Sequence, residues 1–211
     1  MKQIHLFGDS HTTMYNQLSD EIDFKIHFLG ASTAYGLISD HSFTHSFQQI
    51  QEIIKDLDPD RDLIMFAFGE IDCRMLIYFK HMRDSVDLIE VIDLVLDRYF
   101  SAISSVKEKG FEMVVHGIIP AVRQETADNL KFYGDEKTRA SISFNFNERL
   151  KERCLKEGIK YFDTYKLPYL LSGEPPLIPV SVLTPDRMHV NPAVVPIAED
   201  FKKWLKKSGL L

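Results

Sequence analysis

The sequence has little of what marks a disulfide-rich or nucleic-acid-binding protein. Of its 211 residues only two are cysteine and one is tryptophan. Cys73 and Cys154 have no metal-binding spacing, and two thiols suit a reducing compartment, although a disulfide between them is the alternative. The formal net charge is -6, so no excess of positive charge predicts a nucleic-acid partner.

Long apolar runs are also missing. No segment approaches the roughly 18 continuous apolar residues that would span a bilayer. The stretch from Met1 to Gly8 has neither the apolar core nor the cleavage site of a secretory signal. We therefore expect a soluble, cytoplasmic protein without a membrane partner. No linker-like composition divides the chain, which predicts one domain over residues 1–211.

Short strand-forming runs alternate with helical stretches, which is typical of an α/β protein with parallel strands. The run 63–68 is continuously apolar, as expected for a strand buried on both faces, and we place it at the sheet centre. The predicted fold is a three-layer α/β/α sandwich around a five-stranded parallel sheet of flavodoxin-like order. The predicted strands are Gln3–Phe7, Lys25–Leu29, Leu63–Phe68, Met113–His116 and Lys160–Phe162.

Helices are predicted from apolar residues three and four positions apart and from capping residues. Asp87 caps a helix that stops before Gly110. Further helices are expected over about 42–57 and about 137–156, and from Asn191-Pro192 to about Gly209. Two irregular segments remain: 118–135 is expected to wall a ligand pocket, and 172–184 to lead the chain back toward the first strand.

Residues with catalytic chemistry lie near both ends of the chain. The first strand runs into Gly8-Asp9-Ser10, and Asp186-Arg187-Met188-His189 precedes the last helix. A serine hydroxyl needs an imidazole to accept its proton and a carboxylate to orient that imidazole. We predict these roles for Ser10, His189 and Asp186, with Asp9 tying the turn together. The alternatives are a helix cap at Ser10, a surface histidine and a turn-capping aspartate.

This pattern resembles the SGNH (GDSL-type) hydrolases over essentially the whole chain. Residues 8–10 match the family's first block, Asp186-x-x-His189 matches its last, and Gly30 matches the glycine after the second strand. The family's Gly-x-Asn-Asp block corresponds to residues 69–72, which are Gly-Glu-Ile-Asp in this chain. Ile71 therefore stands where the family has its oxyanion-hole asparagine. The resemblance implies the SGNH hydrolase fold and an esterase or deacylase. No cofactor and no metal are expected.

Isoleucine donates no hydrogen bond, and such a donor is typically worth about 3 kcal/mol to a tetrahedral oxyanion. We expect the amides of Ser10 and Gly30 to hold the oxyanion, with His11 or Arg74 as the nearby side-chain donor. Arg74 has a second possible role, recognition of an acidic group on the substrate. The alternative to all of these is loss of the hydrolytic step.

The loop after the third strand carries a cluster of polar groups that we predict to bind substrate. Glu70, Asp72 and Arg74 crowd this loop beside an apolar strand. The simpler alternative is a solvated turn with an ion pair between Arg74 and either acid. Cys73 has no base nearby in the sequence and is not expected to be a nucleophile.

Five further histidines are not expected to be catalytic. His41 and His45 are four apart on a predicted helix and are expected on its surface, because no third ligand is spaced to complete a metal site with them. His5 and His27 lie in strand runs and are expected to pack. His116 ends a strand and is expected to face the pocket without a catalytic role.

The predicted substrate is a small-molecule or carbohydrate ester, hydrolysed through an acyl-enzyme. Acyl transfer to a sugar hydroxyl is the close alternative, and a non-catalytic carbohydrate-binding protein is the rival from another class. A flavodoxin-type phosphate binder is weaker, because the first turn has only one glycine. The aromatic residues Tyr78, Phe79 and Tyr133 are candidates for stacking on a sugar or for the core. The sequence does not indicate an oligomeric state.

Overall fold

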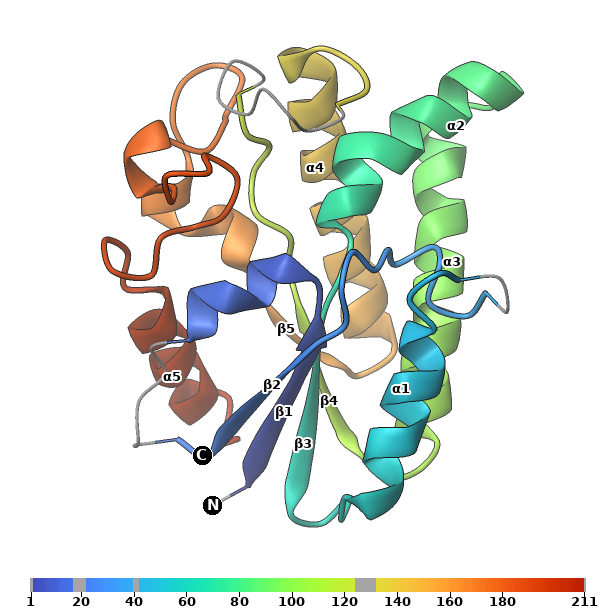
Figure 1. Cartoon of the computed structure of the whole chain (residues 1–211), viewed down its shortest axis with the longest axis vertical. Helices are drawn as coiled ribbons and strands as arrows, with labels where there is room; N and C mark the ends of the chain where they lie inside the picture. Colours follow the sequence, from blue (N-terminus) through green and yellow to red (C-terminus); the bar gives the residue numbers. More distant parts are fainter. Residues whose placement is uncertain (1, 17–21, 40–41, 124–131, 211) are drawn as a thin grey trace.

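A five-stranded, all-parallel sheet forms the middle of the molecule, in the order β2-β1-β3-β4-β5 (Figure 1). The computed structural model describes residues 2–16, 22–39, 42–123 and 132–210. The predicted flavodoxin-like order is confirmed, with β3 at the centre. Each strand lies within one residue of its predicted bounds. The strands are β1 (Gln3–Gly8), β2 (Phe24–Phe28), β3 (Asp62–Ala67), β4 (Glu112–His116) and β5 (Lys160–Phe162).

The central strand is apolar throughout because it is covered on both faces. Side chains of a strand alternate between the two faces of a sheet. Leu63 and Met65 pack into one hydrophobic core, and Ile64 and Phe66 pack into the other. This arrangement explains why the run lacks the alternation of a strand with one wet face.

Helices cover both faces, which confirms the three-layer sandwich (Figure 1). One core joins the sheet to α1 (Ser46–Ile53), α3 (Leu88–Lys107) and α4 (Glu136–Lys156). The other joins it to α5 (Ile197–Lys207) and to the 3-10 helix η1 (Ser10–Tyr15). The nucleophile candidate therefore lies at the start of a short helix packed against one face of the sheet.

Capping residues set the starts of the two long helices, and of these the Asp87 cap was predicted. The Asp87 carboxylate accepts a hydrogen bond from the Ile89 amide at 2.8 Å, and α3 begins at the next residue. Asp135 caps α4 in the same way, accepting from the Thr138 amide at 2.7 Å. Each cap satisfies a backbone N–H that the helix itself leaves unpaired.

Two predicted helix starts were wrong. The first helix begins at Ser46, because His45 has a left-handed backbone with φ of 46°. His45 is therefore not on the helix surface, and His41 lies outside the described residues. The last helix begins at Ile197, because the Asn191 side chain caps a turn by accepting from the Ala193 amide at 3.0 Å. A helix begun at 192 would also have met Pro196, which lacks the N–H of an internal helical residue.

A helical segment after β3 was not predicted. A π-helix, η3 (Asp72–Leu76), continues into α2 (Ile77–Asp84), which ends at Ser85 with φ of 53°. Wide helical turns of this kind occur often at functional sites. Asp72 and Arg74 of the polar cluster lie in this segment and Glu70 lies two residues before it, whereas the sequence placed all three in a loop.

Three further predictions concern the cysteines, the histidines in the strands and membrane-spanning helices. Both cysteines are free and buried, so the alternative disulfide is not formed. His5 and His27 do pack, with their ring nitrogens 3.0 Å apart. In the ranges that the structure describes, no helix has the length and apolar character to cross a bilayer. The single domain and the cytoplasmic location stay predictions.

Candidate functional site

Three parallel strands end at the same edge of the sheet and deliver three of the predicted segments there. Gly8 pairs with Phe28 of β2 and with Ala67 of β3. The Leu29 amide donates to the Gly8 carbonyl at 3.0 Å, so Gly30 begins its loop beside the end of β1. Carboxyl ends of parallel strands are the usual place for ligand sites in open α/β sheets.

Gly8 is required by close packing at this edge. A Cβ atom at residue 8 would lie 2.5 Å from both the Ala67 carbonyl oxygen and the Thr12 methyl carbon. Backbone and a buried side chain leave no room there, so the first glycine of the motif brings the chain close to the neighbouring strand.

Asp9 shapes the turn that presents the serine. Its carboxylate accepts from the His11 amide at 2.9 Å, and its carbonyl accepts from the Thr12 hydroxyl at 2.8 Å. The N-cap of η1 is thus Asp9, and Ser10 is the first residue of the helix. Ser10 is therefore not the cap that was the alternative to its catalytic interpretation.

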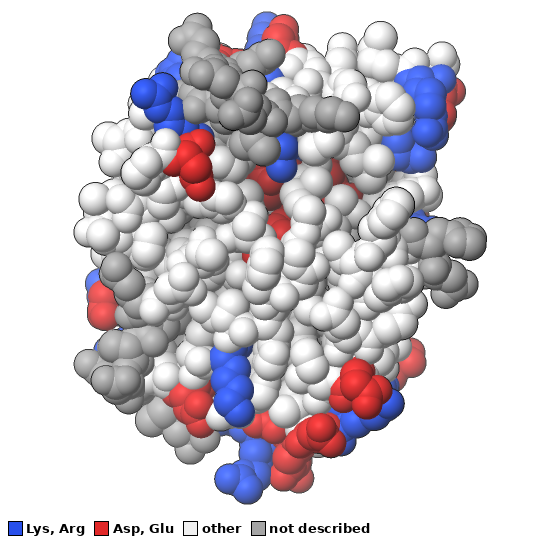
Figure 2. Space-filling view, in the orientation of Figure 1, with Lys and Arg blue, Asp and Glu red and all other residues white. Residues whose placement is uncertain are grey.

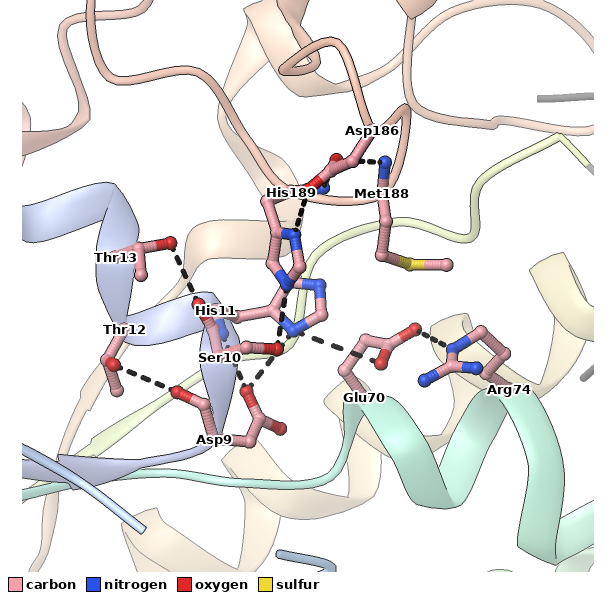
Figure 3. Close-up of polar contacts among 10 residues, drawn as sticks. All are labelled: Asp9, Ser10, His11, Thr12, Thr13, Glu70, Arg74, Asp186, Met188 and His189. Atoms are coloured by element: carbon pink, nitrogen blue, oxygen red, sulfur yellow. Dashed lines mark hydrogen bonds and ion pairs between the residues drawn. The ribbon is translucent and has the colours of Figure 1, made fainter. Parts of the chain in front are cut away.

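Ser10, His189 and Asp186 are joined in one hydrogen-bonded chain (Figure 3). The His189 Nε2 lies 2.7 Å from the Ser10 hydroxyl oxygen, and His189 Nδ1 lies 2.6 Å from Asp186 Oδ2. The three side chains have the connectivity of a Ser-His-Asp triad, with the carboxylate on one side of the imidazole and the hydroxyl on the other. The sequence prediction that these residues meet agrees with this geometry.

The Asp186 carboxylate is held by more than the histidine. Asp186 Oδ1 accepts from the Thr184 hydroxyl at 2.5 Å and from the Met188 and His189 amides at 2.8 and 3.1 Å. Burial alone would raise the pKa of Asp186, but these hydrogen bonds outweigh it and lower the pKa well below its ordinary value. The carboxylate is therefore ionised and fixed. Thr184 was not identified from the sequence.

A second polar chain lies beside the triad (Figure 3). The His11 ring packs against the His189 ring with centroids 4.9 Å apart. His11 Nδ1 lies 3.2 Å from Asp9 Oδ1 and 3.9 Å from Glu70 Oε2. The Arg74 Nε atom donates to Glu70 Oε1 at 2.8 Å. The Glu70 to Arg74 ion pair, which was the alternative to a substrate-binding role, is therefore present, but its side chains are largely buried and do not form a solvated turn.

Asp72 does not belong to the substrate-binding cluster, contrary to prediction. Its side chain is fully buried and accepts from the Ala34 amide at 2.7 Å and the Tyr35 amide at 3.1 Å. Burial raises the pKa of Asp72 to about 7 against the opposing effect of these two amides. Its carboxylate fastens the loop after β2 to the start of the π-helix and is closed to substrate.

The oxyanion side of the site remains partly a prediction. Gly30 has φ of 72°, a left-handed conformation that favours glycine. It stands in the loop that Asp72 fastens, and Ser10 begins η1 next to the same strand end. Ile71 precedes the π-helix and supplies no donor. The Ser10 and Gly30 amides are the predicted backbone donors.

Arg74 lines a small cavity whose opposite wall is the segment after β4. The cavity is bounded by Glu70, Arg74, residues 119–122, Phe132 and Arg139. The predicted role of 118–135 as a pocket wall agrees with this for its described part, and 124–131 lies outside the described residues. Arg139, which the sequence analysis missed on an apparently ordinary helix, is 1% exposed and donates to the Gly134 carbonyl at 2.7 Å.

The other candidate residues fall outside the reacting centre. His116 is buried with His11 around a second internal cavity, and burial lowers the pKa of His116 to about 3. Phe79 and Tyr133 pair with ring centroids 5.2 Å apart and stay more than one third exposed. Tyr78 packs against the core. No cluster of three or more metal-ligating side chains occurs in the described ranges.

Charge is distributed unevenly over the face shown in Figure 2. Basic and acidic side chains gather along the lower rim, near the amino ends of the strands, and the middle of the face is uncharged. Further basic and acidic side chains lie at the top, upper left and upper right of this face, and acidic atoms with basic atoms beside them show at the upper centre, above the carboxyl edge of the sheet.

The fold is shared with solved GDSL-type hydrolases. A GDSL-like lipase from Bacteroides thetaiotaomicron superposes with a TM-score of 0.69 at 11% identity, over 98% of this chain and 89% of that one. A carbohydrate acetylesterase from Sinorhizobium meliloti gives 0.59 at 13% identity, over 97% and 100%. An acetyl xylan esterase gives 0.55 at 17% identity, over 99% and 100%.

Sequence comparisons found less. No family model matches the chain, and no curated protein matches it significantly. The structural neighbours therefore establish the SGNH hydrolase fold, and the chemistry has to be argued from the residues of this chain.

Proposed function

We propose that this chain, which has the fold of the GDSL-type hydrolases, is a serine hydrolase of ester bonds that works through an acyl-enzyme on Ser10. The observation that carries the proposal is the continuous chain from the Ser10 hydroxyl through His189 to Asp186, with contacts of 2.7 and 2.6 Å. The names of the structural neighbours, which include a lipase and two acetylesterases, support the same reaction class.

The residues divide the reaction as follows. His189 Nε2 accepts the Ser10 proton as the hydroxyl oxygen attacks the ester carbonyl, forming a tetrahedral intermediate with a negative oxygen. His189 then donates that proton to the departing alcohol oxygen, leaving the acyl group on Ser10. Asp186 stays ionised and stabilises the imidazolium. Water, deprotonated by His189, then attacks the acyl carbonyl; the bond to the Ser10 oxygen breaks, His189 returns the proton to that oxygen, and the carboxylic acid leaves.

The substrate we propose is a small-molecule or carbohydrate ester. The partly exposed Phe79 and Tyr133 rings lie on α2 and on the segment before α4, and exposed aromatic rings of this kind are the groups on which we propose that a sugar stacks. The hydrogen bond from the Tyr133 amide to the Arg74 carbonyl, at 3.2 Å, links this aromatic pair to the polar cluster. If a sugar hydroxyl replaces water in the last step, the same acyl-enzyme carries out acyl transfer.

A non-catalytic, carbohydrate-binding protein is the second candidate, and Ile71 is the observation that favours it. The two candidates differ in whether Ser10 reacts. Incubation with a fluorophosphonate followed by intact-mass measurement and peptide mapping separates them, because the reagent adds covalently only to an activated serine.

We expect one adduct at Ser10 in the wild type and none in Ser10→Ala. Hydrolysis of p-nitrophenyl acetate should fall to the background rate in the same variant, a loss on the order of 10⁵-fold or more. Absence of the adduct, beside a known serine hydrolase that labels under the same conditions, would contradict the enzyme proposal and favour the binding protein.

A further inference from the structure

The acid and the base of the triad are delivered to the serine together, on one short hairpin. An antiparallel bridge pairs Leu183 with Val190, and the Thr184 amide donates to the His189 carbonyl at 2.8 Å. The side chains of Leu183, Met188 and Val190 are buried in the core beside α5. Apolar residues therefore anchor the hairpin to the body of the protein, and Thr184 with His189 closes it.

Thr184 uses all of its polar groups to hold this hairpin. Besides its amide, its carbonyl accepts from the Arg187 amide at 2.8 Å. Its hydroxyl donates to Asp186 Oδ1 at 2.5 Å, while the His189 carbonyl lies farther from the same hydroxyl oxygen, at 3.2 Å. A hydroxyl has one proton, and a hydrogen bond to a carboxylate is stronger than one to a neutral carbonyl, so the proton is directed at Asp186.

The carboxylate that receives this bond lies in a half-open position. The Asp186 side chain is 52% exposed, so water competes for its oxygens. Its Oδ1 accepts from the Thr184 hydroxyl and from the Met188 and His189 amides, whereas its Oδ2 lies 2.6 Å from His189 Nδ1 (Figure 3). Donors that hold Oδ1 keep the carboxylate from rotating, so Oδ2 stays directed at the imidazole.

Among the described residues, the Thr184 hydroxyl is the one donor to Asp186 Oδ1 that a side chain supplies. The other donors are backbone amides inside the turn, which are present whatever side chains the turn carries. Burial would raise the pKa of Asp186, and the Thr184 hydroxyl is foremost among the hydrogen bonds that lower it. A residue without a hydroxyl at position 184 would keep the backbone bonds of the hairpin and lose this contact.

We propose that Thr184 is a fourth functional member of the hydrogen-bonded chain: its hydroxyl fixes the Asp186 carboxylate and thereby keeps the imidazole in the orientation and tautomer that accept the serine proton. This inference rests on the proposed function and adds a residue to it that lies outside the Asp186-x-x-His189 block. Thr184 is a positioning residue, because it acts through Asp186 and not on the reacting atoms.

The test compares Thr184→Ala with Thr184→Ser, two variants that differ by one oxygen atom, in the hydrolysis of p-nitrophenyl acetate. Alanine removes the hydroxyl, and we expect kcat to fall on the order of tenfold with KM within about twofold, because the lost bond orients the acid and not the substrate. Serine keeps the hydroxyl, so its kcat should stay within about threefold of wild type. Ser101→Ala, which removes a hydroxyl bonded to the Asp97 carbonyl on α3, is the control and should leave kcat unchanged.

A double-mutant cycle distinguishes positioning of the acid from general support of the hairpin. Asp186→Ala removes the carboxylate that the hydroxyl holds, so a further Thr184→Ala substitution in that background should change kcat by less than about twofold. If Thr184 only closed the hairpin, the second substitution would lower kcat by the same factor in both backgrounds. Urea unfolding of each variant shows that the kinetics are measured on folded protein.

Two results would overturn the role of Thr184 and leave the proposed function standing. One is a wild type that labels at Ser10 and hydrolyses ester, with kcat of Thr184→Ala within about twofold of it. The other is an equal loss from Thr184→Ala with and without the Asp186 carboxylate. Thr184→Val, which also lacks the hydroxyl, takes the place of Thr184→Ala if that variant does not fold. A wild type that neither labels nor hydrolyses overturns the proposed function and this inference with it.

Discussion

Asp186 and Asp72 are both aspartates of the matched blocks, and the structure places them in opposite surroundings. The Asp186 side chain is 52% exposed and accepts hydrogen bonds from a hydroxyl, an imidazole and two amides. Asp72 is fully buried and accepts from two amides of another loop. Hydrogen bonding dominates at the first residue and burial at the second.

The comparison shows that the balance between burial and hydrogen bonding sets the pKa of a carboxylate and with it the role that the residue can have. Donors in a half-open setting lower the pKa of Asp186, which stays charged and suits the orientation of an imidazolium. Burial raises the pKa of Asp72 to about 7, which suits a residue that ties two loops together and has no solvent contact. Changing each aspartate should therefore affect different properties.

Asp186→Asn should give the largest effect, and on activity. The amide presents an N–H to His189 Nδ1 and favours the tautomer whose Nε2 already carries a proton, so kcat should drop by up to roughly 10⁴-fold. The kcat of ester hydrolysis, compared between wild type and Asp186→Asn, measures this drop. Thr184→Val, which removes one supporting hydroxyl, should cost far less. A fall in kcat below tenfold for Asp186→Asn would contradict the orienting role.

Asp72→Ala should lower the free energy of unfolding and leave catalysis nearly unchanged. The Ala34 and Tyr35 amides lose their acceptor, at a cost of about 1–3 kcal/mol for each buried donor left unpaired. Urea unfolding measures the change, and kcat per folded molecule should stay within about threefold. Asp72→Asn keeps one acceptor oxygen and should be less destabilised. Loss of activity at unchanged stability would show that Asp72 acts in the reaction.

His27 gives the smallest effect and extends the comparison to a base. Burial, followed by His5 and Lys25, lowers the pKa of His27 to about 4. The unfolded chain binds this proton near pH 6.5 and the folded protein only near pH 4, so stability is lost as pH falls between these values. Wild type should therefore lose more stability than His27→Gln between about pH 7.5 and about pH 5.

Urea unfolding of both proteins at the two pH values gives that difference, and groups common to both cancel. The contribution of Asp72 to stability has the opposite pH dependence. Its raised pKa contributes stability below about pH 4 that is lost as pH rises toward 7. If His27→Gln shows the same pH dependence as wild type, the partly buried histidine pair does not exclude the proton.

Local features of the fold were predictable because local chemistry decides them. The apolar run of β3 and the aspartate caps of α3 and α4 need only near neighbours in sequence. The start of α5 was not predictable in this way, because the pair Asn191-Pro192 is as typical of a turn as of a helix start. The π-helix after β3 likewise has no short-range signature.

The candidate site divides in the same manner. The triad residues were predicted from their types and from their order along the chain, and the structure joins Ser10 to a histidine 179 residues away. The role of Asp72 was predicted wrongly because its partners lie 37 and 38 residues distant. No pattern in 69–74 distinguishes a carboxylate facing substrate from one facing backbone amides.

By itself the sequence determined the strands to within one residue and the Asp87 cap of α3, and it predicted Ser10, His189 and Asp186 as the triad. Only the tertiary structure decided that Asp72 is buried, that Glu70 pairs with Arg74 and that the His11 ring packs beside the His189 ring. The physical reason is that periodicity and capping act within a few residues, whereas burial and electrostatic pairing depend on distances that exist only after the chain has folded.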